Sequence, residues 1–202
     1  MARKNTASSA ARNDGALAAP VMAGDVSEVQ KYGQLIPMRL GLSPEICADS
    51  AKALNQTLAN TITLKDLYKK HHWQISGPTF YQLHLLFDKH YAEQSVLVDQ
   101  IAERIQVLGG LAVAMAGDVA DLTRIERPPS GREEVSVQIT RLLDAHELIL
   151  RQARQAAKKA ESMGDPGTND LLISNVVRTN ELQVWFLAEH LVPLPLVKGK
   201  SV

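Results

Sequence analysis

Four side chains between residues 84 and 103 have the chemical types and the spacing to bind a metal. They are His84, Asp88, Asp99 and Glu103, and all fall on one predicted helix. At about 100° of rotation per residue, steps of four and eleven residues return side chains to nearly the same helix face. One face therefore carries an imidazole and three carboxylates, which are ligands suited to iron and similar divalent metals.

The eleven-residue gap between Asp88 and Asp99 divides this face into two half-sites. The gap spans about 16 Å at a rise of 1.5 Å per residue, which is too far for one metal centre. His84 mirrors Glu103, and Asp88 mirrors Asp99, about the midpoint between positions 93–94. Two antiparallel copies of the helix, related by a two-fold axis at that midpoint, would bring each half-site against the other. The sequence therefore predicts two identical metal sites per dimer, each shared between subunits.

Helix signals dominate the rest of the chain. Ser43 is a good N-cap and Pro44 suits the first helical position, so a helix is expected to begin there. A capping box at Ser130 and Glu133 is expected to open another helix, and Thr168 to cap the last one. The four long helices are predicted over residues 44–73, 79–108, 131–163 and 168–191. Some twenty residues connect the second to the third, with a short helix expected over 118–123.

This pattern predicts an all-α, ferritin-like four-helix bundle. Strand signals are almost absent, and a long crossover allows the second and third helices to run parallel. No glutamate in the chain is followed by histidine three residues later, so the Glu-x-x-His iron site of ferritin-type bundles is not supported. We expect a flexible N-terminal tail over residues 1–40, the bundle over 41–192, and a short C-terminal tail over 193–202.

The composition narrows the function classes. The 202 residues carry no formal net charge, which gives no support for nucleic-acid binding by bulk electrostatics. The lone Cys47 excludes an intrachain disulfide framework and suits a cytoplasmic protein. No apolar run approaches the ~20 residues that span a bilayer, so no membrane role is expected. Residues 1–13 are basic and lack acids, which leaves an organellar transit peptide open as an alternative.

The residues from 71 to 110 resemble the Dps family, the mini-ferritins also called DNA-binding proteins from starved cells. The resemblance extends over roughly residues 44–191. It is carried by the motifs His71-His72-Trp73-Gln74-Ile75-Ser76-Gly77-Pro78, Leu83-His84, Phe87-Asp88, Asp99, Ile101-Ala102-Glu103-Arg104 and Leu108-Gly109-Gly110.

The resemblance implies a hollow homo-dodecamer with ferroxidase centres, holding one or two irons, at its two-fold interfaces. His72, His84 and Asp88 would come from one subunit, and Asp99 and Glu103 from its partner. It also implies that Fe(II) reduces hydrogen peroxide by two electrons without release of hydroxyl radical, and that Fe(III) is stored in the cavity. Zinc could compete for such a nitrogen and oxygen site, so a structural assembly holding zinc remains an alternative.

Other residues near this segment have two readings each. Trp73 could transfer electrons beside the iron, or could be a core aromatic that fixes the end of the first helix. His71 and His90 point about 100° and 200° away from the ligand face, so they are expected to be surface or interface histidines. The same expectation applies to His146 and His190, which have no partner motif.

Family shells have acidic pores on their three-fold axes, and Asp165 and Asp170 lie in the corresponding region. They could equally be a turn aspartate and a helix N-terminal aspartate. Family members that compact DNA use basic tails, whereas residues 1–24 here have a formal excess of only two positive charges. A DNA-compacting nucleoid shell is therefore the alternative function, and DNA binding is expected to be weak or absent.

Overall fold

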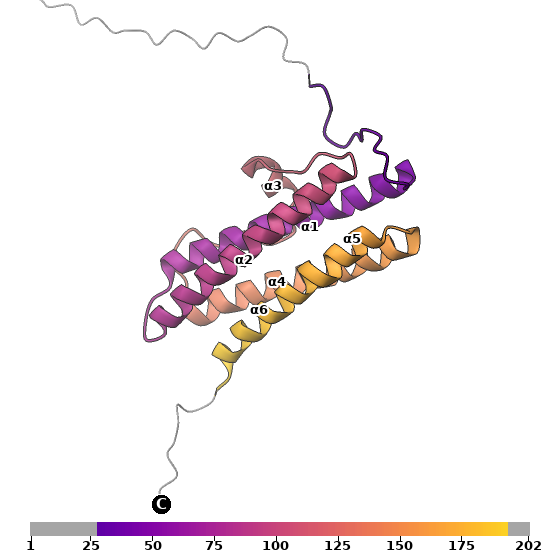
Figure 1. The fold of residues 1–202 in the computed structure, drawn as a ribbon. Helices are drawn as coiled ribbons and strands as arrows, with labels where there is room; N and C mark the ends of the chain where they lie inside the picture. The colour runs from indigo at the N-terminus through magenta and orange to yellow at the C-terminus, as the bar shows by residue number, and fades with distance from the viewer. Residues whose placement is uncertain (1–27, 194–202) are drawn as a thin grey trace, which may run out of the picture.

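The computed structural model describes residues 28–193, and within that range the chain forms helices and no strands. In chain order the elements are α1 (Pro44–Gln74), α2 (Phe80–Val107), α3 (Ala116–Leu122), α4 (Val135–Met163), α5 (Pro166–Asp170), the π-helix η1 (Leu171–Val177), α6 (Arg178–Ala188) and the 3-10 helix η2 (Glu189–Leu191). Figure 1 shows α1 paired with α2, and α4 paired with the run from α5 to α6. The predicted all-α four-helix bundle is confirmed.

The start of α1 follows the predicted capping chemistry. Ser43 Oγ accepts a hydrogen bond from the Ile46 amide at 3.4 Å, and Pro44 occupies the first turn. Leu54 and Leu58, one turn apart, are both fully buried against the other helices. The core face of α1 thus repeats at helical spacing, as a helix packed on one side requires.

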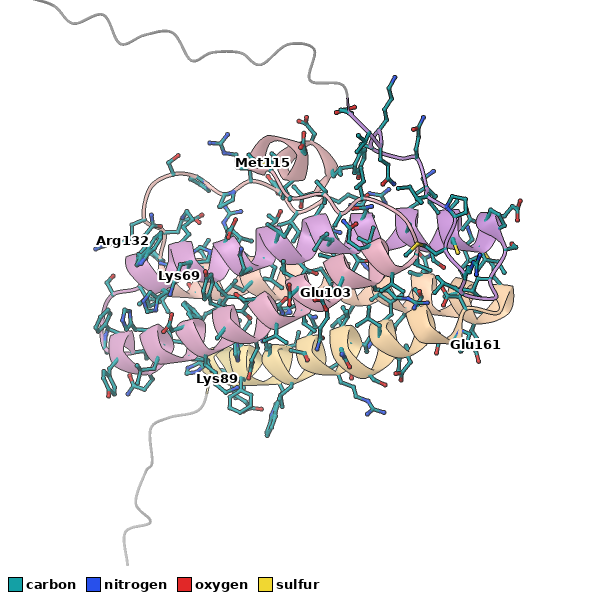
Figure 2. The ribbon with its side chains drawn as sticks, turned by 45° about the horizontal axis from the view of Figure 1, so that its top comes forward. Lys69, Lys89, Glu103, Met115, Arg132 and Glu161 are labelled. Carbon is teal, nitrogen blue, oxygen red and sulfur yellow. The ribbon has the colours of Figure 1, made fainter. Side chains whose placement is uncertain are left out.

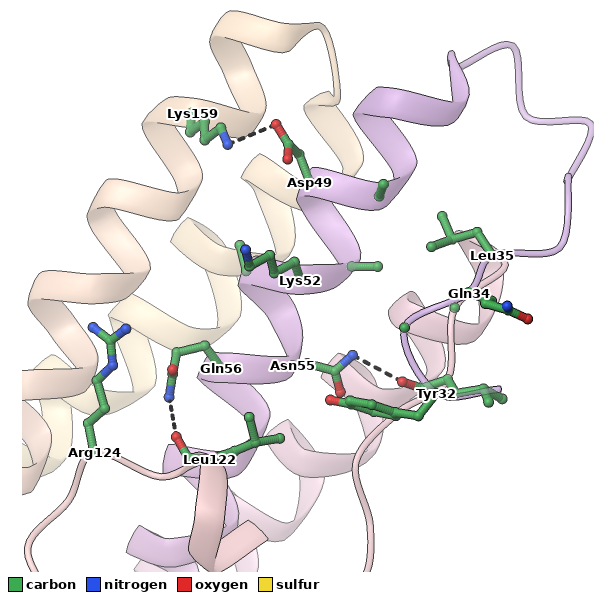
Figure 3. A pocket seen from close by; sticks show the side chains of 16 residues that line it. Tyr32, Gln34, Leu35, Asp49, Lys52, Asn55, Gln56, Leu122, Arg124 and Lys159 are labelled. Atoms are coloured by element: carbon green, nitrogen blue, oxygen red, sulfur yellow. Dashed lines mark hydrogen bonds and ion pairs between the residues drawn. The ribbon is translucent and has the colours of Figure 1, made fainter. Parts of the chain in front are cut away.

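The crossover from α2 to α4 runs back along the bundle, so these two helices point the same way (Figure 1). Asn55 of α1 anchors it by donating to the Leu111 carbonyl at 3.0 Å and accepting from the Val113 amide at 2.8 Å. Gln56 donates to the Leu122 carbonyl at 2.8 Å (Figure 3). These bonds hold α3 and its flanking loops on the outer side of α1, beside a cavity of about 700 Å³.

The predicted capping box before α4 is wrong. The helix begins at Val135, with Glu134 at its N-cap position. The Glu133 carboxylate is bound by the Arg141 guanidinium, with Nε 2.9 Å from both carboxylate oxygens. The Glu133 carboxylate is thus occupied by Arg141 and does not reach back to Ser130, so the capping box is not completed.

The predicted cap by Thr168 is also wrong, because Asp165 takes that role. Its carboxylate accepts from the Thr168 amide at 3.0 Å, and Pro166 occupies the first turn of α5. The same carboxylate accepts from Ser50 Oγ at 2.7 Å and from Arg104 Nη2 at 2.6 Å. Asp165 therefore joins three helices at one end of the bundle.

Residues ahead of α1 lie against the end of α2. The Ile36 amide donates to the Gly109 carbonyl at 2.9 Å. The predicted transit peptide and basic tail fall on residues 1–27, and the C-terminal tail mainly on 194–202, which lie outside the described residues. From residue 28 to residue 193, no helix is both long and apolar enough to cross a bilayer.

Candidate metal centre

His72 of α1 and His84 of α2 face each other across the turn between these helices. Their rings stack with centroids 3.7 Å apart. His72 Nδ1 lies 2.8 Å from the His84 carbonyl oxygen, and His84 Nδ1 lies 3.0 Å from the His72 carbonyl oxygen. Since a carbonyl oxygen only accepts, both Nδ1 atoms must carry the proton and both Nε2 atoms keep a lone pair. Each ring is therefore held in a tautomer that can bind a metal through Nε2.

The helix end explains why this pair forms. The His72 carbonyl lies in the last turn of α1, where carbonyl groups lack a helical partner. The His84 imidazole supplies that partner from the second turn of α2, and the Phe80 ring lies 5.0 Å from the His84 ring. The short turn over residues 75–79 thus positions both imidazoles.

Asp88 lies one turn after His84 on α2, and its carboxylate is held by Lys69 of α1. The hydrogen bond from Lys69 lowers the pKa of Asp88, with smaller contributions from the charge of Lys69 and from His72 and His84. The Asp88 side chain is 53% exposed, so solvent screens this pair. Asp88 is therefore an ionised carboxylate beside two imidazoles, and Lys69 competes with an incoming cation for it.

Asp99 and Glu103 lie further along α2 and are exposed. Figure 2 labels Lys69 and Glu103, which lie at different levels along the bundle. In the part of the chain that the structure describes, no three His, Cys, Asp or Glu side chains come close enough together to hold a metal ion. One chain thus brings together His72 and His84 with Asp88 nearby, and leaves Asp99 and Glu103 apart from them.

No pattern in the sequence marks Lys69 as the partner of Asp88. The two residues are nineteen positions apart on different helices, and only the packing of α1 on α2 brings them together. Sequence reasoning therefore missed Lys69, a cation that contacts one of the predicted ligands.

Trp73 is 71% exposed in the single chain, so the reading of Trp73 as a core aromatic is wrong. Trp73 follows His72 in the last turn of α1. A redox role for Trp73 stays a prediction.

The expectation of surface or interface positions is wrong for His71, His90 and His146, which are all fully buried. The rotation argument correctly pointed His71 and His90 away from the ligand face. On helices that pack in a bundle, however, the face away from the ligands is the core face. His190 is exposed, as expected.

The pore reading of Asp165 is also wrong. Its carboxylate is buried in the bundle and bound by Ser50, Thr168 and Arg104. Asp170 is exposed and accepts from Ser174 Oγ at 2.7 Å. The cavity beside α3 is lined by none of the predicted ligands.

Three comparisons with known proteins agree on the family and the fold of the chain. A family model described as the ferritin-like domain matches residues 51–197. DpsC from Streptomyces coelicolor is 52% identical, with a TM-score of 0.84 over 85% of this chain and 100% of that chain. The DPS protein from Vibrio cholerae O1, described as a member of a broad superfamily of ferritin-like diiron-carboxylate proteins, is 28% identical, with a TM-score of 0.72 over 78% of this chain and 99% of that chain. The nutrient stress-induced DNA-binding protein of Nostoc sp. PCC 7120 is 32% identical over 88% of this chain and 96% of its own length. The chain therefore belongs to the Dps family of ferritin-like proteins.

Proposed function

We propose that the protein is a ferroxidase that oxidises Fe(II) and stores Fe(III) inside a hollow dodecamer in the cytoplasm. Membership of the ferritin-like Dps family supports iron storage and protection against oxidative damage in general. The observation that carries the proposal is the reciprocal bonding of His72 and His84. It leaves two Nε2 lone pairs beside the ionised Asp88.

Each centre is completed by a second subunit. One chain supplies His72, His84 and Asp88. Asp99 and Glu103 lie on the same face of α2, and among residues 28–193 no group of side chains from one chain forms a metal cluster with them. Leu85 and Val96 are also exposed on this face, at 51% and 56%. An exposed apolar side chain within one half-site and another between the two half-sites support a contact with another copy of α2.

Fe(II) is the substrate of this centre. Imidazole nitrogens and carboxylate oxygens would bind Fe(II), and two bound Fe(II) ions would leave coordination positions open for the oxidant. Two Fe(II) ions each give one electron to hydrogen peroxide, and two protons from solvent complete two water molecules. This two-electron step releases no hydroxyl radical, and peroxide is the oxidant that we propose the centre prefers.

The test is stopped-flow Fe(II) oxidation with hydrogen peroxide and, separately, with oxygen. His84→Ala/Asp88→Ala should abolish the fast phase while light scattering shows an unchanged assembly. His190→Ala/Asp121→Ala, which removes an exposed imidazole and an exposed carboxylate elsewhere, should keep it. Fast oxidation in the first variant would overturn the assignment of the ligands. Equal rates with both oxidants would overturn the preference for peroxide.

A zinc-holding structural assembly is distinguished by the same assay. If the centre is a ferroxidase, added Zn(II) competes for the ligands and slows Fe(II) oxidation as its concentration rises. Absence of fast oxidation in the zinc-free wild type, together with tight Zn(II) binding, would favour the structural role.

DNA compaction is the second candidate function, favoured by the name of the Nostoc relative. Phosphate contacts make such binding dependent on salt, and the small charge excess of residues 1–24 predicts weak affinity. A gel shift should be faint at low salt and vanish near physiological salt. Firm retention of DNA at physiological salt, lost after deletion of the tail, would favour the nucleoid shell.

A further inference from the structure

A group of buried polar side chains meets at the centre of the bundle, one from each long helix. Tyr68 of α1, His90 of α2, His146 of α4 and Asn180 of α6 are all fully buried. Tyr68 Oη lies 2.5 Å from His146 Nε2 and 3.0 Å from His90 Nδ1. The tyrosine hydroxyl thus lies between two imidazoles.

The hydrogen-bond partners fix where each proton lies. Asn180 Nδ2 donates to the Val176 carbonyl at 2.7 Å, which turns Asn180 Oδ1 toward His146 Nδ1, also at 2.7 Å. Because an amide oxygen only accepts, His146 carries its proton on Nδ1 and presents the Nε2 lone pair to Tyr68. Tyr68 therefore donates to His146, and the neutral His90 donates from Nδ1 to Tyr68 Oη.

This arrangement gives Tyr68 a built-in proton acceptor. Burial, and secondarily the charge of Glu93, raises the pKa of Tyr68 well above its usual value. Burial also lowers the pKa of His146 to about 3, so the resting pair is a neutral phenol and a neutral imidazole. A phenol that loses an electron becomes a strong acid, and even a weakly basic imidazole at 2.5 Å then takes its proton.

We propose that Tyr68 is a redox-active residue, which supplies one electron to hydrogen peroxide when a centre holds one Fe(II) instead of two. The inference rests on the proposed ferroxidase function. Tyr68 precedes His72 by one turn of α1, about 6 Å along the helix axis, and its neighbour Lys69 binds Asp88. Tyr68 is therefore attached to the helix one turn from a predicted ligand, with its hydroxyl directed to His146 and His90 in the core.

The step balances in electrons and protons. Peroxide accepts one electron from Fe(II) and one from Tyr68, and with two protons from solvent it becomes two water molecules. The Tyr68 O–H bond breaks, and its proton moves to His146 Nε2. The products are Fe(III), a neutral tyrosyl radical and a protonated His146. Without the tyrosine, the half-loaded centre would release a hydroxyl radical.

Tyr68 is better suited to this role than the other aromatic residues. Tyr32, Tyr81 and Trp73 are exposed, so a radical on them would meet solvent and other molecules. Among the described residues, no other tyrosine hydroxyl is hydrogen-bonded to an imidazole. The Phe87 ring, 5.9 Å from the Tyr68 ring, adds apolar shielding.

The first test uses the iron-free assembly, so that it does not depend on ferroxidase activity. Photogenerated tris(bipyridine)ruthenium(III) serves as a one-electron oxidant, followed by freeze-quenched electron paramagnetic resonance in D₂O. Wild type and the control Tyr81→Phe should show a neutral tyrosyl radical coupled to two hydrogen-bonding deuterons, one on His90 Nδ1 and one on His146 Nε2. Tyr68→Phe should lose that signal. Its persistence in Tyr68→Phe, or its absence from wild type, overturns the proposal.

The second test adds one Fe(II) per centre and excess peroxide in the presence of a spin trap. Tyr68→Phe should release several-fold more hydroxyl-radical adduct than Tyr81→Phe, and equal yields would overturn the protective role. The two proposals fail separately. Normal iron oxidation without a Tyr68 radical sinks only this inference, whereas a Tyr68 radical in a protein that does not oxidise iron overturns the ferroxidase and, with it, the role of Tyr68 at the iron centre.

Discussion

His72 and His84 each donate a hydrogen bond from Nδ1 to the backbone carbonyl of the other. The two residues are twelve positions apart, yet each fixes the ring orientation and the tautomer of the other. This reciprocity makes the α1–α2 turn part of the candidate centre. Loss of either imidazole is expected to disturb both.

His84→Gln should weaken Zn(II) binding to the assembled protein by about 10–100-fold, the range usual when metal-site imidazoles or their supports are removed. Glutamine offers no Nε2 lone pair and releases the His72 ring from its stack. Isothermal titration calorimetry measures the change, with the exposed His190→Gln as the matched control. Unchanged affinity in His84→Gln would mean that zinc binds elsewhere.

Lys69→Met should strengthen Zn(II) binding a few-fold, because the cation no longer competes for the Asp88 carboxylate or repels the metal. The pKa of Asp88 should rise toward its ordinary value in the same variant. Calorimetry reports the affinity and carboxyl-carbon NMR reports the titration. Lys65→Met is the control, since Lys65 pairs with Asp66 on the same helix. Weaker binding in Lys69→Met would show that Lys69 supports the centre.

Hydrophobic spacing and breaker residues were sufficient to place the four long helices. The predicted second helix, 79–108, differs from α2 by one residue at each end. The start of α4 was misplaced where Glu133 binds Arg141 eight residues later, a partner outside the capping rules. The start of α5 was misplaced although its signal is local, since Asp165 caps the Thr168 amide and is followed by Pro166. The π-helix η1 was not predicted either, since its wider turns carry no periodic signature in seven residues.

The candidate metal ligands were accessible to sequence reasoning because four of them share one helix face. The Tyr68 network was not, because its members come from four helices and meet only when these pack. His146 illustrates the difference. Nothing near it in sequence marks a partner, yet both of its ring nitrogens are hydrogen-bonded in the core.

Stability should fall as the pH drops from about 6.5 to 4. Burial lowers the pKa of His71 and His90 to about 4 and that of His146 to about 3. In this window the unfolded chain binds protons at these histidines and the folded chain does not, so acid favours unfolding by at most about 4 kcal/mol per pH unit. Thermal melts followed by circular dichroism should show a steadily falling Tm. A flat Tm from pH 6.5 to 4.5 would contradict neutral burial of these residues.

Gly109→Ala should destabilise the contact between the segment before α1 and the end of α2. Gly109 has a φ of +84°, and a Cβ there would lie 2.0 Å from the Ile36 carbonyl oxygen. The strained backbone alone costs on the order of 1–3 kcal/mol. Urea unfolding measures the loss. Gly131→Ala, where a Cβ meets nothing within 4 Å, should change little. Equal stability of the two variants would contradict this packing.

The claim that two subunits complete each centre is tested most directly by mixing two inactive variants. His84→Ala/Asp88→Ala lacks one half-site, and Asp99→Ala/Glu103→Ala lacks the other. After co-refolding, half of randomly formed dimers are mixed, and each mixed dimer regains one intact centre of two. We expect each variant alone to lack fast Fe(II) oxidation and the mixture to recover about a quarter of the wild-type amplitude. No recovery in verified mixed assemblies, or full activity of either variant alone, would contradict a centre shared between subunits.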